Sequence, residues 1–173
     1  MKLILLAGNS ISNKEWIENV EKTLRPLFTE TELHYYQHWT TGDGLIDLDR
    51  ELDLLSKDIN DSEKYVIFAK SAGTLLALKG VRENKLSPHK CIFVGTAINW
   101  GREKNFSVDE WLLEYSIPTL FIQKTKDPTS TFEELSSLLN ECEVKSFTLK
   151  EIPGEDHHYD EIESLKMEIK DFL

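Results

Sequence analysis

Short runs of consecutive apolar residues alternate along this chain with longer segments in which apolar residues recur every three or four positions. The runs at 3–7, 65–69 and 91–94 have the length of strands and are apolar at every position. Strands of a parallel sheet, which are buried on both faces, have this composition. Because the intervening segments have the period of amphipathic helices, the pattern predicts βαβ units and a parallel sheet covered by helices.

The same pattern places six strands and six helices along the chain. Strands are expected at 2–7, 32–38, 64–70, 90–96, 119–124 and 144–152. Helices are expected at 14–28, 46–60, from 74 onward, 108–115, 130–139 and 160–172. The chain is therefore predicted to be one α/β domain, a three-layer αβα sandwich with a mostly or wholly parallel sheet. Residues 98–118 contain no predicted strand, and we expect this insertion to form a lid or pocket wall.

Composition and charge exclude several classes of protein. The 173 residues are 40% hydrophobic and 29% charged, as in a globular domain with a substantial core. With 20 basic against 31 acidic residues, the net charge of −11 disfavours binding to nucleic acid or anionic membranes. The first apolar run is short and ends at Gly8-Asn9, which indicates a strand and not a signal peptide. Cys91 and Cys142 provide no disulfide framework, which fits a cytoplasmic location.

The sequence Ala69-Lys70-Ser71-Ala72-Gly73 joins the third predicted strand to a helix. A serine on such a turn exposes its hydroxyl at a helix N-terminus, provided that the residues two positions before and after it are small. The following backbone N–H and the helix dipole then face negative charge that develops on a substrate. Ser71 is accordingly a candidate nucleophile, although a lone serine here could equally cap the helix. We expect Lys70 to project into solvent or to form an ion pair, and the alternative is that it recognises charge on a substrate.

An aspartate and a histidine follow two later strands, and function gathers at the carboxyl ends of parallel strands. Asp127 follows the fifth strand and His157 the sixth. The order serine, aspartate, histidine is that of an acyl-transfer site on such a sheet. Asp127 precedes Pro128 and could be a turn residue. However, a capping box of Ser130 with Glu133 leaves Asp127 unneeded as a helix cap.

At these residues the chain resembles the α/β-hydrolase family along nearly its whole length. Residues 69–73 are similar to the family's nucleophile elbow, with Ala69 where glycine is usual, and residues 124–127 are similar to its acid loop. Gly154-Glu155-Asp156-His157 is similar to its histidine loop. The chain is also similar to small serine hydrolases of the retinoblastoma-binding-protein-9 type and to short dienelactone-hydrolase-like chains. The resemblance implies a minimal fold with strand order 2-1-3-4-5-6, lacking the first two antiparallel strands of larger members.

The resemblance also implies a mechanism. Ser71, Asp127 and His157 would form a triad that cleaves an ester, thioester or amide of a small-molecule acyl substrate without a cofactor. The oxyanion hole is expected at the backbone N–H of Ala72 together with that of Asn9 or Ser10.

The histidine loop has further interpretations. The family match favours His157 over His158 as the base. The cluster of Asp156, His157, His158 and Asp160 also suggests a metal site. Adjacent histidines usually point apart, and no second cluster has ligand spacing, so no metal is expected.

Four aromatic residues are candidates for the pocket lining. His38 and Trp39 follow the second predicted strand and either line a pocket beside residues 8–10 or cover the sheet edge. Trp100 and Trp111 belong to the insertion, where they either form a lid over the pocket or pack the insertion itself.

The function that follows is an esterase-like serine hydrolase. The alternative is a non-catalytic protein-interaction module that keeps the fold, and an intact set of serine, aspartate and histidine argues against it. A nucleotide or flavin binder would need G-x-G-x-x-G after the first strand, which Gly8-Asn9-Ser10-Ile11-Ser12 lacks. Neither a particular acyl group nor an oligomeric state follows from the sequence.

Overall fold

A central parallel sheet organises the molecule. The computed structural model describes residues 1–42, 44–59 and 64–173. Its sheet has six strands, all parallel, in the order β2-β1-β3-β4-β5-β6. The strands are β1 (Lys2–Leu6), β2 (Glu30–His34), β3 (Tyr65–Lys70), β4 (Lys90–Val94), β5 (Thr119–Lys124) and β6 (Phe147–Ile152). The predicted αβα sandwich and its strand order are confirmed.

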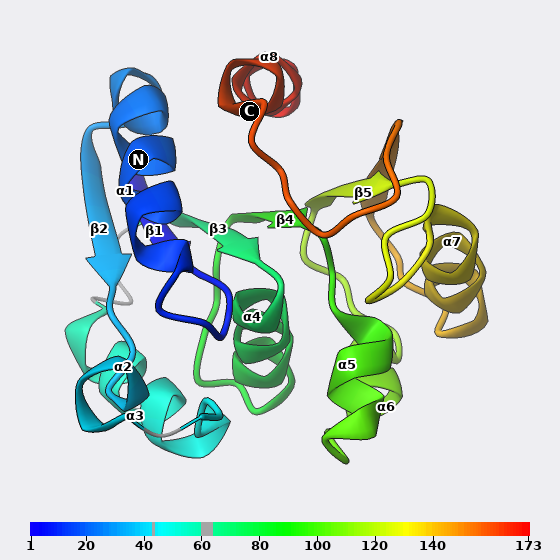
Figure 1. Cartoon of the computed structure of the whole chain (residues 1–173), viewed down its shortest axis with the longest axis horizontal. Helices are drawn as coiled ribbons and strands as arrows, with labels where there is room; N and C mark the ends of the chain where they lie inside the picture. Colours follow the sequence, from blue (N-terminus) through cyan, green and yellow to red (C-terminus); the bar gives the residue numbers. More distant parts are fainter. Residues whose placement is uncertain (43, 60–63) are drawn as a thin grey trace.

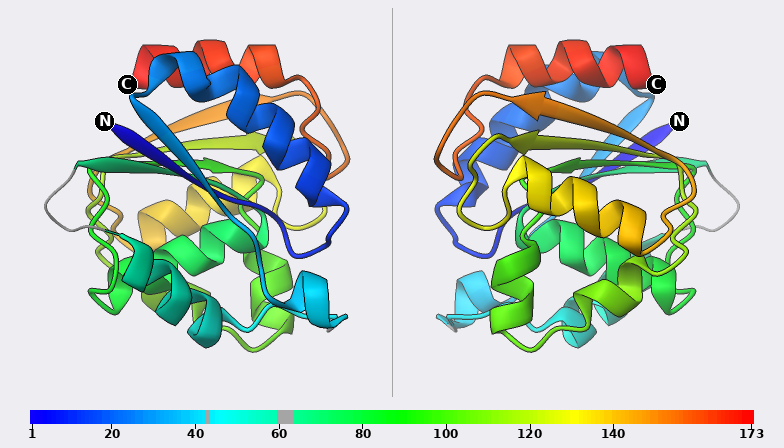
Figure 2. Two further views of the ribbon diagram at one scale, coloured as in Figure 1. Left: turned by 90° about the vertical axis from the view of Figure 1, so that its left-hand side faces the viewer. Right: turned by 90° about the vertical axis from the view of Figure 1, so that its right-hand side faces the viewer.

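Helices cover both faces of the sheet (Figures 1 and 2). One face carries α1 (Asn13–Leu24) and α8 (Ile162–Phe172). The other carries α3 (Leu48–Asp58), α4 (Ala72–Arg82), α5 (Ile98–Glu103), α6 (Val108–Leu112) and α7 (Phe132–Glu141). The short elements are the 3₁₀ turn η1 (Arg25–Leu27) and α2 (His38–Thr41), which lies beyond the end of β2.

Burial follows position in the sheet. Every residue of the central strand β3 is buried, whereas the edge strands β2 and β6 have no fully buried residue. Central strands are covered on both faces, so the apolar runs seen in the sequence mark the middle of the sheet. No helix in the described part of the chain is both long and apolar enough to cross a membrane.

The first helix and the second strand differ from their predicted bounds. The helix expected at 14–28 ends at Leu24, because Pro26 has no N–H to donate, and the chain continues as the 3₁₀ turn η1. The strand expected at 32–38 occupies Glu30–His34 instead. After it, Tyr36 turns inward, is 1% exposed, and donates its hydroxyl to Ala7 O at 2.7 Å. His38 therefore lies on α2 and not on a strand end.

Several other elements begin at residues different from the predicted ones, because local hydrogen bonds fix where they start. The helix expected from 46 begins at Leu48, because Asp47 caps the N–H of Arg50, and its expected end at 60 lies outside the described residues. The strand expected from 144 begins at Phe147, because residues 144–146 turn back toward earlier elements. The capping box predicted for Ser130 with Glu133 is wrong. Thr131 and Glu134 form it, one position later.

The insertion at 98–118 folds into two short helices, α5 and α6, and α6 packs on α4. Trp100 and Trp111 both contact the ring of Phe106, with centroid separations of 6.0 and 6.2 Å. Trp111 belongs to the buried core, and the Lys79 ammonium near the end of α4 lies 5.8 Å from its ring centroid. Of the two interpretations open for these tryptophans, the structure places them in the packing of the insertion.

Candidate active site

Ser71 lies on the turn between β3 and α4 in an unusual backbone conformation. Its φ of 54° and ψ of −121° fall where residues other than glycine are rarely found. Three hydrogen bonds hold it there. Its N–H donates to Val94 O at 3.1 Å, and its carbonyl accepts from the N–H and the hydroxyl of Thr74 at 3.0 and 2.6 Å. The Ser71 hydroxyl does not cap α4, so a capping role does not explain this residue.

The small residues around Ser71 have a steric reason. A Cβ at Gly73 would lie 2.6 Å from both Leu6 O and Ala7 O, which is closer than van der Waals contact. Ala69, on the other side of the serine, is completely buried. The turn is thus packed against the end of β1, and Asn9 and Ser10 lie in the loop that directly follows this strand.

Asp127 and His157 form a direct pair. Asp127 lies in the loop after β5 and is 0% exposed, and His157 lies in the loop after β6. His157 Nδ1 is 2.8 Å from Asp127 Oδ2 and 3.0 Å from Oδ1. Because a carboxylate only accepts, Nδ1 carries the proton, which leaves Nε2 as the basic nitrogen. The structure therefore brings together two of the three residues predicted for the triad.

Three further donors hold the Asp127 carboxylate. The Tyr159 hydroxyl donates to Oδ2 at 2.7 Å, while the N–H and hydroxyl of Thr129 donate to Oδ1 at 2.8 and 2.7 Å. Burial by itself raises the pKa of Asp127, but its bonds to His157 and Thr129 outweigh burial and lower that pKa. The acid therefore stays ionised and fixed in orientation. Neither Thr129 nor Tyr159 stands out in the sequence, although each lies two positions after a residue of the predicted triad.

His157 Nε2 is buried and has no hydrogen-bond partner among the described residues. Gly95, with φ of 59°, makes room for the imidazole, since a Cβ there would lie 3.0 Å from His157 Cε1. Gly95 directly follows Val94, which accepts the N–H of Ser71. His157 lies against Gly95 and Ser71 is bonded to Val94, so both adjoin the same short segment in space. The Ser71 hydroxyl makes no hydrogen bond with another described residue, and such contacts often tighten only when substrate binds.

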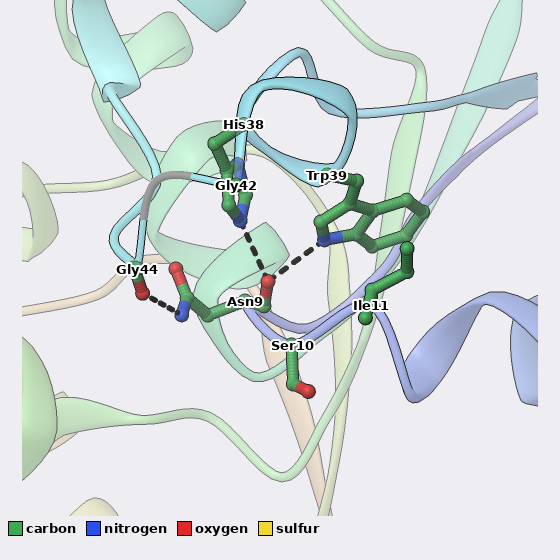
Figure 3. Close-up of a pocket in the computed structure, with 7 residues that line it drawn as sticks. All are labelled: Asn9, Ser10, Ile11, His38, Trp39, Gly42 and Gly44. Carbon is green, nitrogen blue, oxygen red and sulfur yellow. Dashed lines mark hydrogen bonds between the residues drawn. The ribbon is translucent and has the colours of Figure 1, made fainter.

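The loop after β1 is fixed by two aromatic donors. Asn9 O accepts from His38 Nε2 at 2.7 Å and from Trp39 Nε1 at 2.8 Å (Figure 3). In a planar trans peptide the Ser10 N–H points opposite to this carbonyl, so both donors also set the direction of that N–H. The N–H groups of Asn9 and Ser10 bond to no other described residue. Ala72 N–H, as the first in α4, has no acceptor within the helix. These are the donors predicted for an oxyanion hole.

A cavity of about 300 Å³ lies beside this loop and is lined by His38, Trp39, Ser10 and Ile11 (Figure 3). The Asn9 side chain closes one side of it by donating to Gly44 O at 2.9 Å and accepting from Ile46 N–H at 2.8 Å. The structure therefore places His38 and Trp39 at a pocket. Trp100 and Trp111 line neither this cavity nor the one described below.

Two predictions about charged residues are resolved by burial. Lys70 was expected in solvent or in an ion pair, and this was wrong. It is 6% exposed, and its ammonium donates to Asn13 Oδ1 at 2.8 Å because the end of β3 lies under α1. His158 is exposed, whereas His157 is half-buried and holds Asp127. Among the described residues no group of three or more acidic, histidine or cysteine side chains has an arrangement that could hold a metal ion.

Replacing Tyr159 with phenylalanine tests whether its hydroxyl positions the acid. We expect kcat for an ester to fall about tenfold with little change in KM, because Asp127 loses one charge-assisted hydrogen bond but keeps the others. Tyr115→Phe is the matched control, since Tyr115 is also buried but its hydroxyl bonds to Thr119 at 3.2 Å, at the other end of β5. Equal losses of kcat in both variants would contradict a positioning role for Tyr159.

Comparison with known proteins addresses the fold. No protein-family model and no curated protein matches the sequence. An uncharacterized protein from Bacillus cereus is similar over 99% of this chain and 59% of its own, with a TM-score of 0.75 and 21% identity. A YdeN-like hydrolase from Pectobacterium atrosepticum has a TM-score of 0.75 and 18% identity, over 99% of this chain and 89% of its own. Est1E from Butyrivibrio proteoclasticus, with ferulic acid bound, has a TM-score of 0.71 and 16% identity, over 99% of this chain and 87% of its own. The chain therefore has the α/β-hydrolase fold.

Proposed function

We propose that this chain, which has the α/β-hydrolase fold, is a serine hydrolase that cleaves an ester, thioester or amide of a small-molecule acyl substrate. The observation that carries the proposal is the Asp127–His157 pair, whose Nε2 has no hydrogen-bond partner among the described residues. The His157 ring lies against Gly95, and the strained Ser71 turn is bonded to the preceding Val94. A neighbour in fold that is named as a monoacylglycerol lipase from Paleococcus ferrophilus supports an ester substrate. A second neighbour, Est1E, is described with ferulic acid bound.

In the proposed reaction, Ser71 Oγ attacks the substrate carbonyl carbon while His157 Nε2 takes the hydroxyl proton. Asp127 stays ionised, accepts the hydrogen bond from His157 Nδ1–H throughout and stabilises the imidazolium. The N–H of Ala72, with that of Asn9 or Ser10, binds the oxyanion of the tetrahedral intermediate. As the bond to the leaving group breaks, His157 gives that group its proton. Water, activated by His157, then attacks the acyl group on Ser71 and releases the acid.

Labelling with a fluorophosphonate probe tests the nucleophile. The probe forms a bond to an activated serine oxygen, so we expect the wild type to be labelled and Ser71→Ala to remain unlabelled. Ser137→Ala is the control, since Ser137 is exposed on α7 and should not affect labelling. Turnover of short p-nitrophenyl esters should disappear in Ser71→Ala and His157→Ala. Labelling of both wild type and Ser71→Ala would contradict the assignment of Ser71 as the nucleophile. A wild type that is neither labelled nor able to turn over an ester would favour the non-catalytic interaction module.

The cytoplasm is the proposed location, because both cysteines are buried free thiols. Burial raises the pKa of Cys91 to about 12, so this thiol is unreactive. With a net charge of −11 the proposal includes no nucleic-acid or membrane partner. It includes no cofactor.

A further inference from the structure

Lys70, the residue before the candidate nucleophile, is a buried cation with incomplete pairing. It is 6% exposed, and the only hydrogen bond that its ammonium makes with a described residue goes to the neutral side chain of Asn13, at 2.8 Å. The ammonium also lies 5.2 Å from the centroid of the Trp16 ring. No carboxylate of a described residue lies within ion-pair distance of it. An ammonium has three donors, and a buried charge is normally paired with an opposite charge. Lys70 has donors to spare.

The ammonium borders a cavity of about 290 Å³, which we call the Lys70 pocket. Its lining includes Asn13, Trp16, Lys70, His157 and Asp160. Trp16 is held in place because its Nε1–H donates to Tyr159 O at 2.9 Å. The walls are thus an aromatic face, an ammonium and the imidazole of the candidate base.

The charged groups that act on the Lys70 ammonium are the carboxylates of Asp127 and Asp160 and the ammonium of Lys124. Asp127, the acid nearest the base, is already bound to His157, Thr129 and Tyr159. Asp160 is exposed at the rim, where solvent weakens its field. Burial lowers the pKa of Lys70 while Asp127 and Asp160 act to raise it, so an anion bound beside the ammonium would offset the cost of burial.

The position of His157 indicates which half of a substrate, the acyl group or the leaving group, would occupy the Lys70 pocket. In acyl transfer the histidine gives its proton to the leaving group, so the leaving group must lie against the imidazole. The Lys70 pocket is lined by that imidazole, whereas the cavity lined by His38 and Trp39 lies across the oxyanion loop and is not.

We propose that the Lys70 pocket binds a carboxylate on the leaving group of the substrate, with the Lys70 ammonium as its partner and the Trp16 ring against its apolar part. The substrate class is then an ester or amide whose alcohol or amine half carries a carboxylate. This inference rests on the proposed serine hydrolase activity and deepens it.

Lys70 also has a structural connection that the test must separate from binding. Asn13, which accepts from Lys70, donates through Nδ2 to Ser10 O at 3.0 Å, in the oxyanion loop. Loss of Lys70 would therefore slow every substrate to some extent. A carboxylate subsite predicts an additional loss that is specific to the anionic substrate.

The kinetic test compares para-acetoxybenzoate with its methyl ester, which differ in the leaving-group charge. We expect the ratio of kcat/KM for the acid to kcat/KM for its methyl ester to fall about 10- to 100-fold in Lys70→Met. Lys126→Met, which removes an exposed lysine paired with Glu155 in the acid loop, should leave the ratio unchanged. Lys70→Gln can still donate to Asn13 without carrying charge, and it replaces Lys70→Met if that variant does not fold.

A binding test keeps this inference distinguishable from the proposed function. In Ser71→Ala, titration with para-hydroxybenzoate followed by NMR should show saturable binding that weakens about 10- to 100-fold when Lys70→Gln is added. Such binding without any ester turnover by the wild type would leave the pocket standing and overturn the hydrolase. Ester turnover with an unchanged ratio in Lys70→Gln would overturn the carboxylate subsite. Equal changes in ratio for Lys126→Met would also overturn it, by showing a general charge effect.

Discussion

Replacing Asp127 with asparagine is expected to lower kcat for an ester by about 10⁴-fold while the protein stays folded. The two Thr129 donors on Oδ1 require an acceptor there, so the amide nitrogen of the asparagine would replace Oδ2, and the Tyr159 hydroxyl would lose its acceptor at that position. That nitrogen then donates toward His157 Nδ1, which loses its proton and moves it to Nε2. An imidazole protonated at Nε2 is unable to take the proton of Ser71. Steady-state kinetics and a circular dichroism melt measure the two halves of the expectation.

Asp156→Asn is the matched control for this change. Asp156 lies in the histidine loop one residue before His157, is exposed, and accepts from Lys124 Nζ at 2.8 Å and from His158 N–H at 2.7 Å. We expect its kcat to stay within about threefold of the wild type, because an exposed ion pair contributes little. A kcat for Asp127→Asn within tenfold of the wild type would contradict the assignment of Asp127 as the acid of the triad.

Gly73→Ala is expected to lower the free energy of unfolding by about 1–3 kcal/mol, and to reduce activity with it. The sign is informative, because alanine in place of glycine within a helix is ordinarily stabilising by about 1 kcal/mol. Here the new Cβ meets Leu6 O and Ala7 O at 2.6 Å, and backbone atoms of a central strand have nowhere to move. The N-terminus of α4 must shift instead, and Ser71 shifts with it. Urea denaturation and ester turnover measure the two effects.

Gly80→Ala in the same helix provides the comparison. A Cβ at Gly80 would meet the side chains of Leu86 and Leu52, the latter at 2.9 Å. These side chains can change rotamer, so the free energy of unfolding should fall by less than in Gly73→Ala, and activity should persist. A Gly73→Ala protein as stable and as active as the wild type would show that the close approach of α4 to β1 does not set the position of Ser71.

The sheet was predictable because strands buried on both faces leave a signal in every residue, as in the run at 65–69. The edge strand β2 begins two residues and ends four residues before its predicted bounds, since exposed or half-exposed positions such as Glu30 and Thr31 have no such signal. The capping box was misplaced by one residue, because Ser130 and Thr131 are both good caps and both have glutamate three positions later.

The candidate site also contains some residues that the sequence indicates and others that it does not. Ser71, Asp127 and His157 follow strand ends in a recognisable order, so the sequence alone indicates them. The partners of Asp127 are set by how the loops after β5 and β6 fold onto each other, and nothing in the composition of Thr129 or Tyr159 reveals that contact. Lys70 was misjudged because a lysine is usually exposed, and only the position of α1 shows that this one is covered.

The hydrogen bonds from His38 and Trp39 to Asn9 O make the loop of residues 8–10 depend on a second stretch of the chain. His38 lies 29 residues and Trp39 lies 30 residues after Asn9 in the sequence. Residues 8–10 are therefore not a transferable module. If these residues were grafted into another scaffold without His38 and Trp39, the peptide between Asn9 and Ser10 would lose both donors that orient it. That peptide would then be free to rotate. A successful transplant has to move residues 38–46 along with them. For the same reason, sequence changes in that second stretch should be read as changes to the site.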